Sequence, residues 1–339
     1  MTVQEIYKLA VQLGIENDIR GKAVVERNLR RVRAMYDEMP AKKRAHFDAD
    51  RLTNPYMDTR YFLPAGRQAA TTQVKKILIG IDMDSSEVLL AQELNRQNPK
   101  KPIDLIMSHH PVGKALTQGL SDVMRIQIEL LHKFGIPLNI AESLTKRRLD
   151  EVSKNTQAGN YYGTIDAAAL LGFPVMCVHT PSDNMVARFM FDLVGKKQKK
   201  LDTVGDVMDV LMEIPEYKIA RERGNPPYIL IGDRDNYAGK IAITEITGGT
   251  EGSVDMYEKL AHFGIGTIIG MHLSPKHEEQ ARKHHINVLI AGHMSSDSLG
   301  MNLFLDALER RGIEIVPTSG FTRVSRTAKK TNKTAKRKR

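Results

Sequence analysis

The chain has 339 residues, of which 41% are hydrophobic and 27% charged, and this composition predicts about two globular domains and excludes a wholly disordered or fibrous protein. A single cysteine, Cys177, excludes an intramolecular disulfide, and the absence of a long apolar run or a signal-like N-terminus predicts a cytoplasmic protein without membrane contact. The net charge is +10, but nine of the 50 Lys and Arg residues and no acid lie within 323–339; the other 41 basic and 40 acidic residues exclude a broadly basic binding face.

Residues 1–70 are predicted to form a helical arm. Apolar residues recur with helical spacing from Val3 to Leu13 and again from Val24 to Met35. The pattern ends in a predicted loop over 52–66, which contains Asn-Pro and Pro-Ala-Gly sequences.

Residues 71–200 are predicted to form a first α/β half, because short apolar runs alternate with amphipathic segments. The predicted strands are 77–81, 103–107 and 174–178, and the predicted helices are 86–94, 121–134 and 183–194. A Lys-rich stretch and an Asn-Pro-Pro sequence mark 201–239 as a linker or insert.

Residues 240–320 are predicted to form a second α/β half with the same alternation. The predicted strands are 240–246, 267–270, 287–291 and 314–316, and the predicted helices are 252–263, 275–284 and 295–311. The segments IDLIM-SHH and INVLI-AGH are similar, one in each half, and indicate an old duplication. The predicted fold class is therefore α/β, with two similar halves and mostly parallel sheets behind a helical arm.

Residues 321–339 are predicted to form a disordered basic tail, because this stretch has no apolar periodicity. Such a tail could contact nucleic acid weakly through counterion release, or serve only to keep the protein soluble. It lacks the aromatic residues that single-stranded nucleic acid binding favours.

Two adjacent histidines, His109 and His110, follow the predicted strand 103–107 directly. Open α/β sheets place their ligands at this end of the strands. Adjacent side chains on extended backbone diverge, so the two imidazoles could serve two neighbouring ions.

Two further strands are each followed by a histidine and an acid four residues later: His179 with Asp183, and His293 with Asp297. Positions i and i+4 share one helix face, so both side chains of a pair can reach one centre. Helix capping is the simpler interpretation of each acid taken alone. Three such strand ends from both halves favour a metal site with nitrogen and oxygen ligands, which suits zinc, manganese or iron.

With these motifs, residues 75–320 resemble the Nif-three-like family, also described as GTP cyclohydrolase I type 2 homologues with a dinuclear metal centre. The resemblance implies that His109 and His110 bind two divalent ions, that Asp183 bridges them, and that His293 and Asp297 complete the set. It also implies mixed sheets in two α/β repeats and a homo-oligomer, a hexamer.

The sequence departs from the family pattern at two places. Asp297 stands where the family usually has Glu, and the stretch between His110 and Asp183 is longer than in most relatives. Within this longer stretch Glu142 and His179 could line a cavity. Gly249, in the predicted second half, could line it as well.

Asp82 supports a competing interpretation, because ILIGIDMDSS resembles the nucleophile turn of haloacid-dehalogenase-type phosphatases. In such an enzyme Asp82 would attack phosphorus and Asp84 would act as acid and base. The sequence shows no convincing downstream lysine and acidic pair to complete that set. Asp82 could instead line the metal cavity.

We expect a dinuclear metal protein that acts as a hydrolase, because water held by two ions ionises near neutral pH. The family resemblance implies that the substrate is a nucleotide-like or heterocyclic small molecule. Two alternatives remain open. One is a non-enzymatic metal-binding or regulatory scaffold protein, and the other is the phosphatase that uses Asp82.

Overall fold

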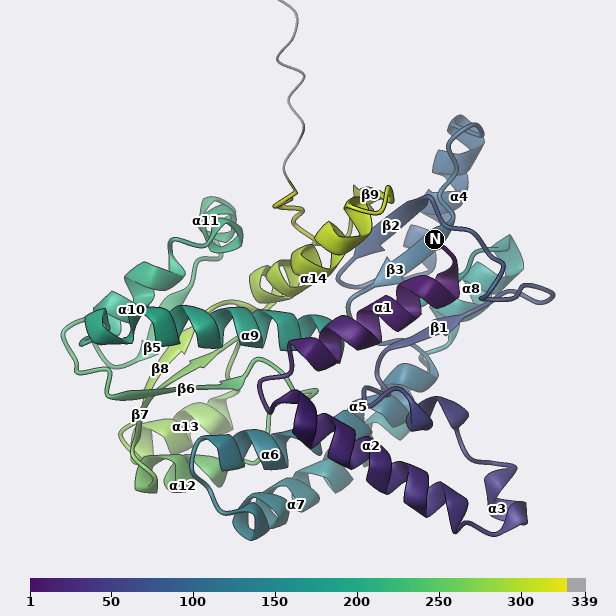
Figure 1. Cartoon of the computed structure of the whole chain (residues 1–339). Helices are drawn as coiled ribbons and strands as arrows, with labels where there is room; N and C mark the ends of the chain where they lie inside the picture. The colour runs from purple at the N-terminus through teal and green to yellow at the C-terminus, as the bar shows by residue number, and fades with distance from the viewer. Residues whose placement is uncertain (328–339) are drawn as a thin grey trace, which may run out of the picture.

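The computed structural model describes residues 1–327 and contains two β-sheets with helices on their faces (Figure 1). Within these described residues, no helix has the length and apolar character needed to cross a membrane.

The first sheet has five strands in the order β1-β4-β3-β2-β9. The strands are β1 (Arg60–Phe62), β2 (Lys76–Gly80), β3 (Leu105–Ser108), β4 (Val175–Cys177) and β9 (Glu314–Pro317). All neighbours pair in parallel except the edge strand β1, which is antiparallel to β4.

The second sheet has four strands in the order β5-β8-β7-β6. The strands are β5 (Tyr228–Ile231), β6 (Lys240–Glu245), β7 (Ile265–Gly270) and β8 (Asn287–Ile290). The edge strand β5 is again antiparallel to its neighbour, and the other pairs are parallel. Strand order and direction therefore match between the halves, β1–β4 corresponding to β5–β8, which confirms an α/β fold with two similar halves and mixed, mostly parallel sheets.

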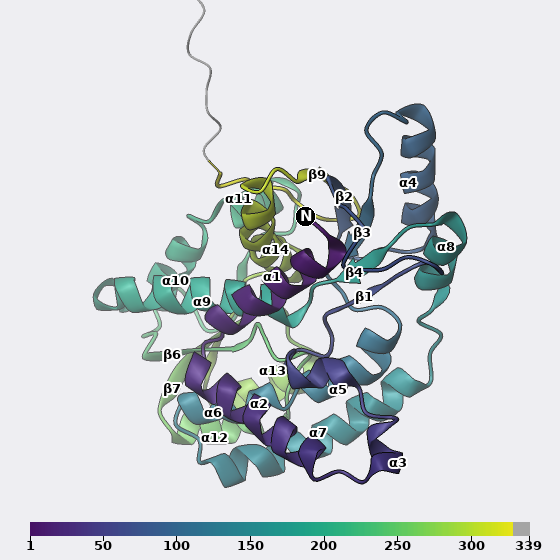
Figure 2. The ribbon, with the colours of Figure 1, turned by 45° about the vertical axis from the view of Figure 1, so that its right-hand side comes forward.

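Helices cover both faces of the first sheet (Figure 2). Side chains alternate along β2, so Ile77 and Ile79 face α1 (Val3–Glu16) and α14 (His293–Glu309), whereas Leu78 faces the opposite side. On that opposite side lie α4 (Ser85–Gln97) and α8 (Gly163–Leu171).

The remaining helices surround the second sheet and connect the halves. They are α2 (Lys22–Asp37), α3 (Ala41–Arg44), α5 (Leu120–Val123), α6 (Ile126–Lys133), α7 (Leu138–Gln157), α9 (Thr180–Lys197), α10 (Val204–Leu211), α11 (Pro215–Glu222), α12 (Met256–His262) and α13 (Pro275–Lys283). Residues of α9 and α14 belong to the cores of both sheets, so these two helices join the halves.

The helices α9 and α14 cross at very short distance near their N-terminal ends. A Cβ atom on Gly300 would collide with the main-chain carbonyl of Ser182, so only glycine permits this approach. The crossing brings together the start of the helix after β4 and the start of the helix after β8.

Several segments belong to other parts of the fold than the domain boundaries predicted from the sequence. The predicted arm contributes β1 to the first sheet and α1 to its core, and the predicted linker contributes β5 to the second sheet. Strand β9, predicted within the second half, pairs with β2 of the first sheet.

The first residues of the predicted disordered tail, 321–327, are held against the folded chain. Phe321 is buried, and Arg323 and Arg326 form ion pairs with Asp306 on α14 and Glu216 on α11. A solvated tail over 321–327 is therefore the wrong expectation, because these residues are held by buried carboxylates. The rest of the predicted tail lies outside the described residues.

Candidate metal centre

The structure gathers the predicted ligands where the two halves meet. His109 and His110 follow β3, while Asp183 lies in the first turn of α9 and Asp297 in the first turn of α14. Gly292, with a φ of +94°, supports the turn that starts α14 at His293. The matching strand ends and the close helix crossing place all of these side chains around one space.

Three of the histidines have their Nδ1 atoms hydrogen-bonded on the outside of the cluster. The partners are the Val178 carbonyl for His109 at 3.1 Å, Asp82 for His110 at 2.7 Å, and Asp58 for His179 at 2.7 Å. When Nδ1–H donates to such an acceptor, Nε2 carries a lone pair and its direction is fixed. The three Nε2 atoms are therefore oriented as metal ligands.

The Nε2 atoms lie at metal-ligand separations from the two carboxylates. Four Nε2–carboxylate oxygen distances are 3.5 Å: His109 to Asp183, and His109, His110 and His293 to Asp297. A fifth, from His179 to Asp183, is 3.8 Å. These distances are long for direct hydrogen bonds. A tetrahedral ion with bonds of about 2.1 Å holds its ligand atoms about 3.4 Å apart.

Asp297 is the most unusual group in the cluster. Asp297 is 1% exposed, and neither of its carboxylate oxygens has a hydrogen-bond partner among the described residues. Burial alone would raise the pKa of Asp297, but the surrounding His109, His110 and His293 hold it well below its usual range. A buried carboxylate that is charged and lacks hydrogen bonds needs a nearby cation, and the residues present therefore fit a metal ion.

Asp297 is shared between two of the groups that could hold an ion. His110 and His293 form one with it, and His109 and Asp183 form the other; within each group the ligand atoms lie within 4.8 Å of one another. Asp183, for which the family resemblance implied the bridging position, belongs only to the second group. Asp297 is therefore the residue that these two candidate groups have in common.

The cluster perturbs the proton affinities of its members in opposite directions. Burial works against the charged form of His110, but the neighbouring Asp297 and Asp82 carboxylates raise the pKa of His110 to about 10. Burial lowers the pKa of His293 to about 4 and raises that of Asp183 to about 6. Metal binding at this cluster therefore displaces protons.

The cluster lines a small cavity of about 40 Å³, whose other wall comes from the second sheet. Glu245, Glu251 and His272 lie on that wall. His272 Nδ1 is 3.4 Å from Glu251, and burial is the main reason that the pKa of Glu245 is raised to about 7. The cavity volume is about that of one water molecule in the liquid, so it has room for ions and water but not for a whole nucleotide.

The other residues singled out from the sequence lie at different distances from the cluster. His179 and Gly249 line the cavity, and Asp82 contacts the His/Asp cluster through His110. Glu142 lines a separate cavity between α2 and α7.

Sequence reasoning missed Asp58, Glu245 and His272. Asp58 and Glu245 follow no motif. The similarity of the two halves could have indicated His272, because it lies two residues after β7, just as His110 lies two residues after β3.

The chain is similar to several solved structures. A NIF3 superfamily protein from Sphaerobacter thermophilus is 28% identical with a TM-score of 0.70, and the match covers 80% of this chain and 94% of that one. Reduced HcgD from Methanocaldococcus jannaschii is 14% identical with a TM-score of 0.46, covering 77% and 89% of the two chains. A NIF3-related protein from Bacillus cereus is 10% identical with a TM-score of 0.39, covering 85% and 96%.

No protein-family model and no curated protein matches the sequence. The assignment rests on the first of these structures, which agrees in sequence and in fold over most of both chains. The chain therefore has the fold of the NIF3 superfamily and resembles this member of it in sequence.

Proposed function

We propose that the chain binds two divalent cations at the His/Asp cluster and is a metal-dependent hydrolase for a nucleotide-like or heterocyclic small molecule. The observation that carries the metal proposal is the buried Asp297 carboxylate without hydrogen bonds, encircled by imidazole Nε2 atoms at 3.5 Å. Zinc, manganese or iron suits this mixture of nitrogen and oxygen ligands.

The proposed ligands divide into two sets that share Asp297. His109 and Asp183 would hold one ion, and His110 and His293 would hold the other. His179 Nε2, 3.8 Å from Asp183, is available to the first ion. Asp82 and Asp58 would act through the histidines, because each fixes the ring orientation of the imidazole whose Nδ1 it accepts.

Two bound ions would supply Lewis-acid polarisation and a water that ionises near neutral pH. The chain's own residues would position the substrate and move protons. Glu245 and His272 face the cluster from the opposite wall, and a Glu with a pKa of about 7 can accept and return a proton. A neighbouring cavity of about 480 Å³, whose lining includes His110 and Asp82, offers room for the rest of the substrate.

The phosphatase alternative gives Asp82 a different task. Asp82 accepts a 2.7 Å hydrogen bond from His110, and this contact favours an orienting role over that of a free nucleophile. One experiment separates the metal-dependent hydrolase from the phosphatase. If Asp82 is the nucleophile, Asp82→Asn alone must abolish phosphoester hydrolysis while the metal content stays normal.

A homo-oligomer is part of the proposal. Leu89 on α4 and Leu170 on α8 are 61% and 87% exposed in the single chain, on two helices that lie side by side. Light scattering on the purified protein should give several times the mass of one chain, and a monomeric mass would contradict this part.

The experiment that tests the function combines metal analysis with a substrate screen. The metal-loaded protein is assayed with GTP, other nucleotides and phosphoesters, beside Asp183→Ala and the control Asp192→Ala. Asp192 is a half-exposed acid farther along α9 that pairs with Arg188. We expect turnover that is lost in Asp183→Ala and kept in Asp192→Ala. Full metal binding without any turnover would instead support the metal-binding scaffold, and activity that survives Asp183→Ala would refute the site.

A further inference from the structure

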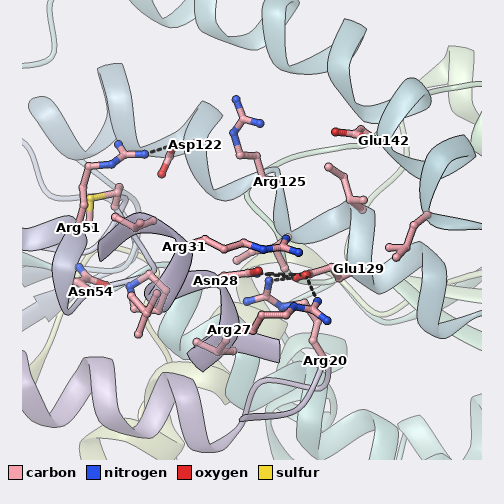
Figure 3. A pocket seen from close by; sticks show the side chains of 18 residues that line it. Arg20, Arg27, Asn28, Arg31, Arg51, Asn54, Asp122, Arg125, Glu129 and Glu142 are labelled. Atoms are coloured by element: carbon pink, nitrogen blue, oxygen red, sulfur yellow. Dashed lines mark hydrogen bonds and ion pairs between the residues drawn. The ribbon is translucent and has the colours of Figure 1, made fainter. Parts of the chain in front are cut away.

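A second and larger cavity lies apart from the metal centre. It has a volume of about 410 Å³ and is bounded by α2, by the segment 51–57 and by the stretch from α5 to the start of α7. It shares no lining residue with the His/Asp cavity. Figure 3 shows this cavity, with side chains of α2 on one side and Arg125 on the other.

The lining of this cavity is rich in arginine. Five arginines and three acids contribute to it: Arg20, Arg27, Arg31, Arg51, Arg125, Asp122, Glu129 and Glu142. Two of the three acids, Glu129 and Asp122, already accept hydrogen bonds from arginine side chains. Glu129 accepts hydrogen bonds from Arg20, Arg27 and Asn28, at distances of 2.7–3.2 Å.

Asp122 is also occupied, by Arg51 at 2.7 Å. Arg31 and Arg125 have no hydrogen bond or ion pair from their guanidinium groups to any residue within 1–327. They come from separate elements, since Arg31 lies on α2 and Arg125 lies between α5 and α6. Two exposed guanidinium groups without partners among these residues thus border one half-open cavity, whose lining has more arginines than acids.

The rest of the lining is largely apolar. Val25 and Leu29 contribute from α2, Ile126 from α6 and Leu138 from α7. A volume of this size, with an apolar wall and a few charged groups, is typical of a site for a small organic ligand.

We propose that this cavity binds a small organic molecule that carries a phosphate group, of the size of a nucleoside monophosphate. The phosphate would lie between Arg31 and Arg125, because a planar guanidinium donates two parallel hydrogen bonds to phosphate oxygens and a phosphate monoester has three such oxygens. The apolar wall would contact the organic part. Glu142, which also lacks a partner among the described side chains, would accept from a ligand hydroxyl or amino group.

The test is calorimetric titration of the full chain with AMP in the presence of EDTA, which removes ions from the metal centre. The double variant Arg31→Ala/Arg125→Ala should bind AMP at least tenfold more weakly. The matched control is Arg30→Ala/Arg33→Ala, which removes the same charge from exposed positions of α2 that do not line the cavity. The control should bind as the unaltered chain does.

Three further probes identify the ligand chemistry. Adenosine should bind at least tenfold more weakly than AMP. Glu142→Gln should weaken the binding of AMP but leave the binding of inorganic phosphate unchanged or make it tighter. Citrate, a carboxylate anion, should bind more weakly than AMP. The proposal is overturned if AMP does not bind in EDTA, if the Arg31/Arg125 double variant binds it as tightly as the control, or if citrate binds and AMP does not.

Discussion

Replacing Asp297 by Asn should remove most of the stabilisation that metal ions give to this protein. The carboxylate is buried, lacks hydrogen bonds and is shared by both proposed ligand sets. Asn keeps its size but loses the negative charge that both ions would require. The informative quantity is the rise in Tm on adding metal, because comparison with the EDTA-treated form of the same variant cancels any effect on the metal-free protein.

The expected size of this effect follows from linkage. At a free metal concentration of about 100 times Kd, each of the two ions stabilises the folded state by about 2.7 kcal/mol, about 5.4 kcal/mol together. At about 2 °C per kcal/mol for a chain of this size, the unaltered protein should gain about 11 °C. Loss of a ligand shared by both ions should raise each Kd at least about 100-fold, which leaves about 0.8 kcal/mol in total and a rise of about 2 °C.

The assay is thermal unfolding with Zn²⁺, Mn²⁺ or Fe²⁺, each compared with EDTA. The control is Asp306→Asn, the same chemical change at another buried acid of α14, which pairs with Arg323. This control should lower Tm equally with and without metal and keep the full metal-induced rise. If Asp297→Asn also keeps the full rise, the assignment of Asp297 as a shared ligand is refuted.

Four other outcomes are expected. Asp58→Asn should weaken metal binding about 10- to 100-fold in a competition titration, because it no longer orients His179, and unchanged affinity would contradict that role. Gly300→Ala should lower the free energy of unfolding by about 1–3 kcal/mol in urea, because its methyl group collides with α9; a neutral effect would disprove the close crossing. Glu245→Gln should keep both ions but reduce turnover, and lost metal would make Glu245 a ligand instead. Truncation after Thr327 should leave unfolding and metal content unchanged, whereas truncation after Phe321 should lower Tm, because it removes the ion pairs of Arg323 and Arg326.

The central strands could be predicted from the sequence because parallel strands buried on both faces are continuous apolar runs. The prediction 77–81 corresponds to β2, and 287–291 corresponds to β8, each displaced by no more than one residue. The edge strands β1 and β5 were missed because they are short and partly exposed; Tyr228 in β5 is 49% exposed. The pairing of β9 with β2 depends on tertiary contacts that no local pattern carries.

The candidate site was predictable to the extent that its residues follow strand ends. The repeated His-x-x-x-Asp spacing after β4 and β8 identified two pairs, and the fold brings them together. The proposal that Asp297 is the shared ligand rests on how α9 crosses α14, and the spacing in the sequence cannot reveal this crossing. The outer partner Asp58 lies in a loop about 120 residues from His179, where no periodic pattern marks it.

The most direct test of the account is the metal content per chain, measured by elemental analysis after loading and removal of free ions. The account predicts two ions per chain for the unaltered protein and substantial loss of both in Asp297→Asn, with Asp306→Asn still holding two. A chain that binds no ion, or an Asp297→Asn variant that retains both, would contradict it.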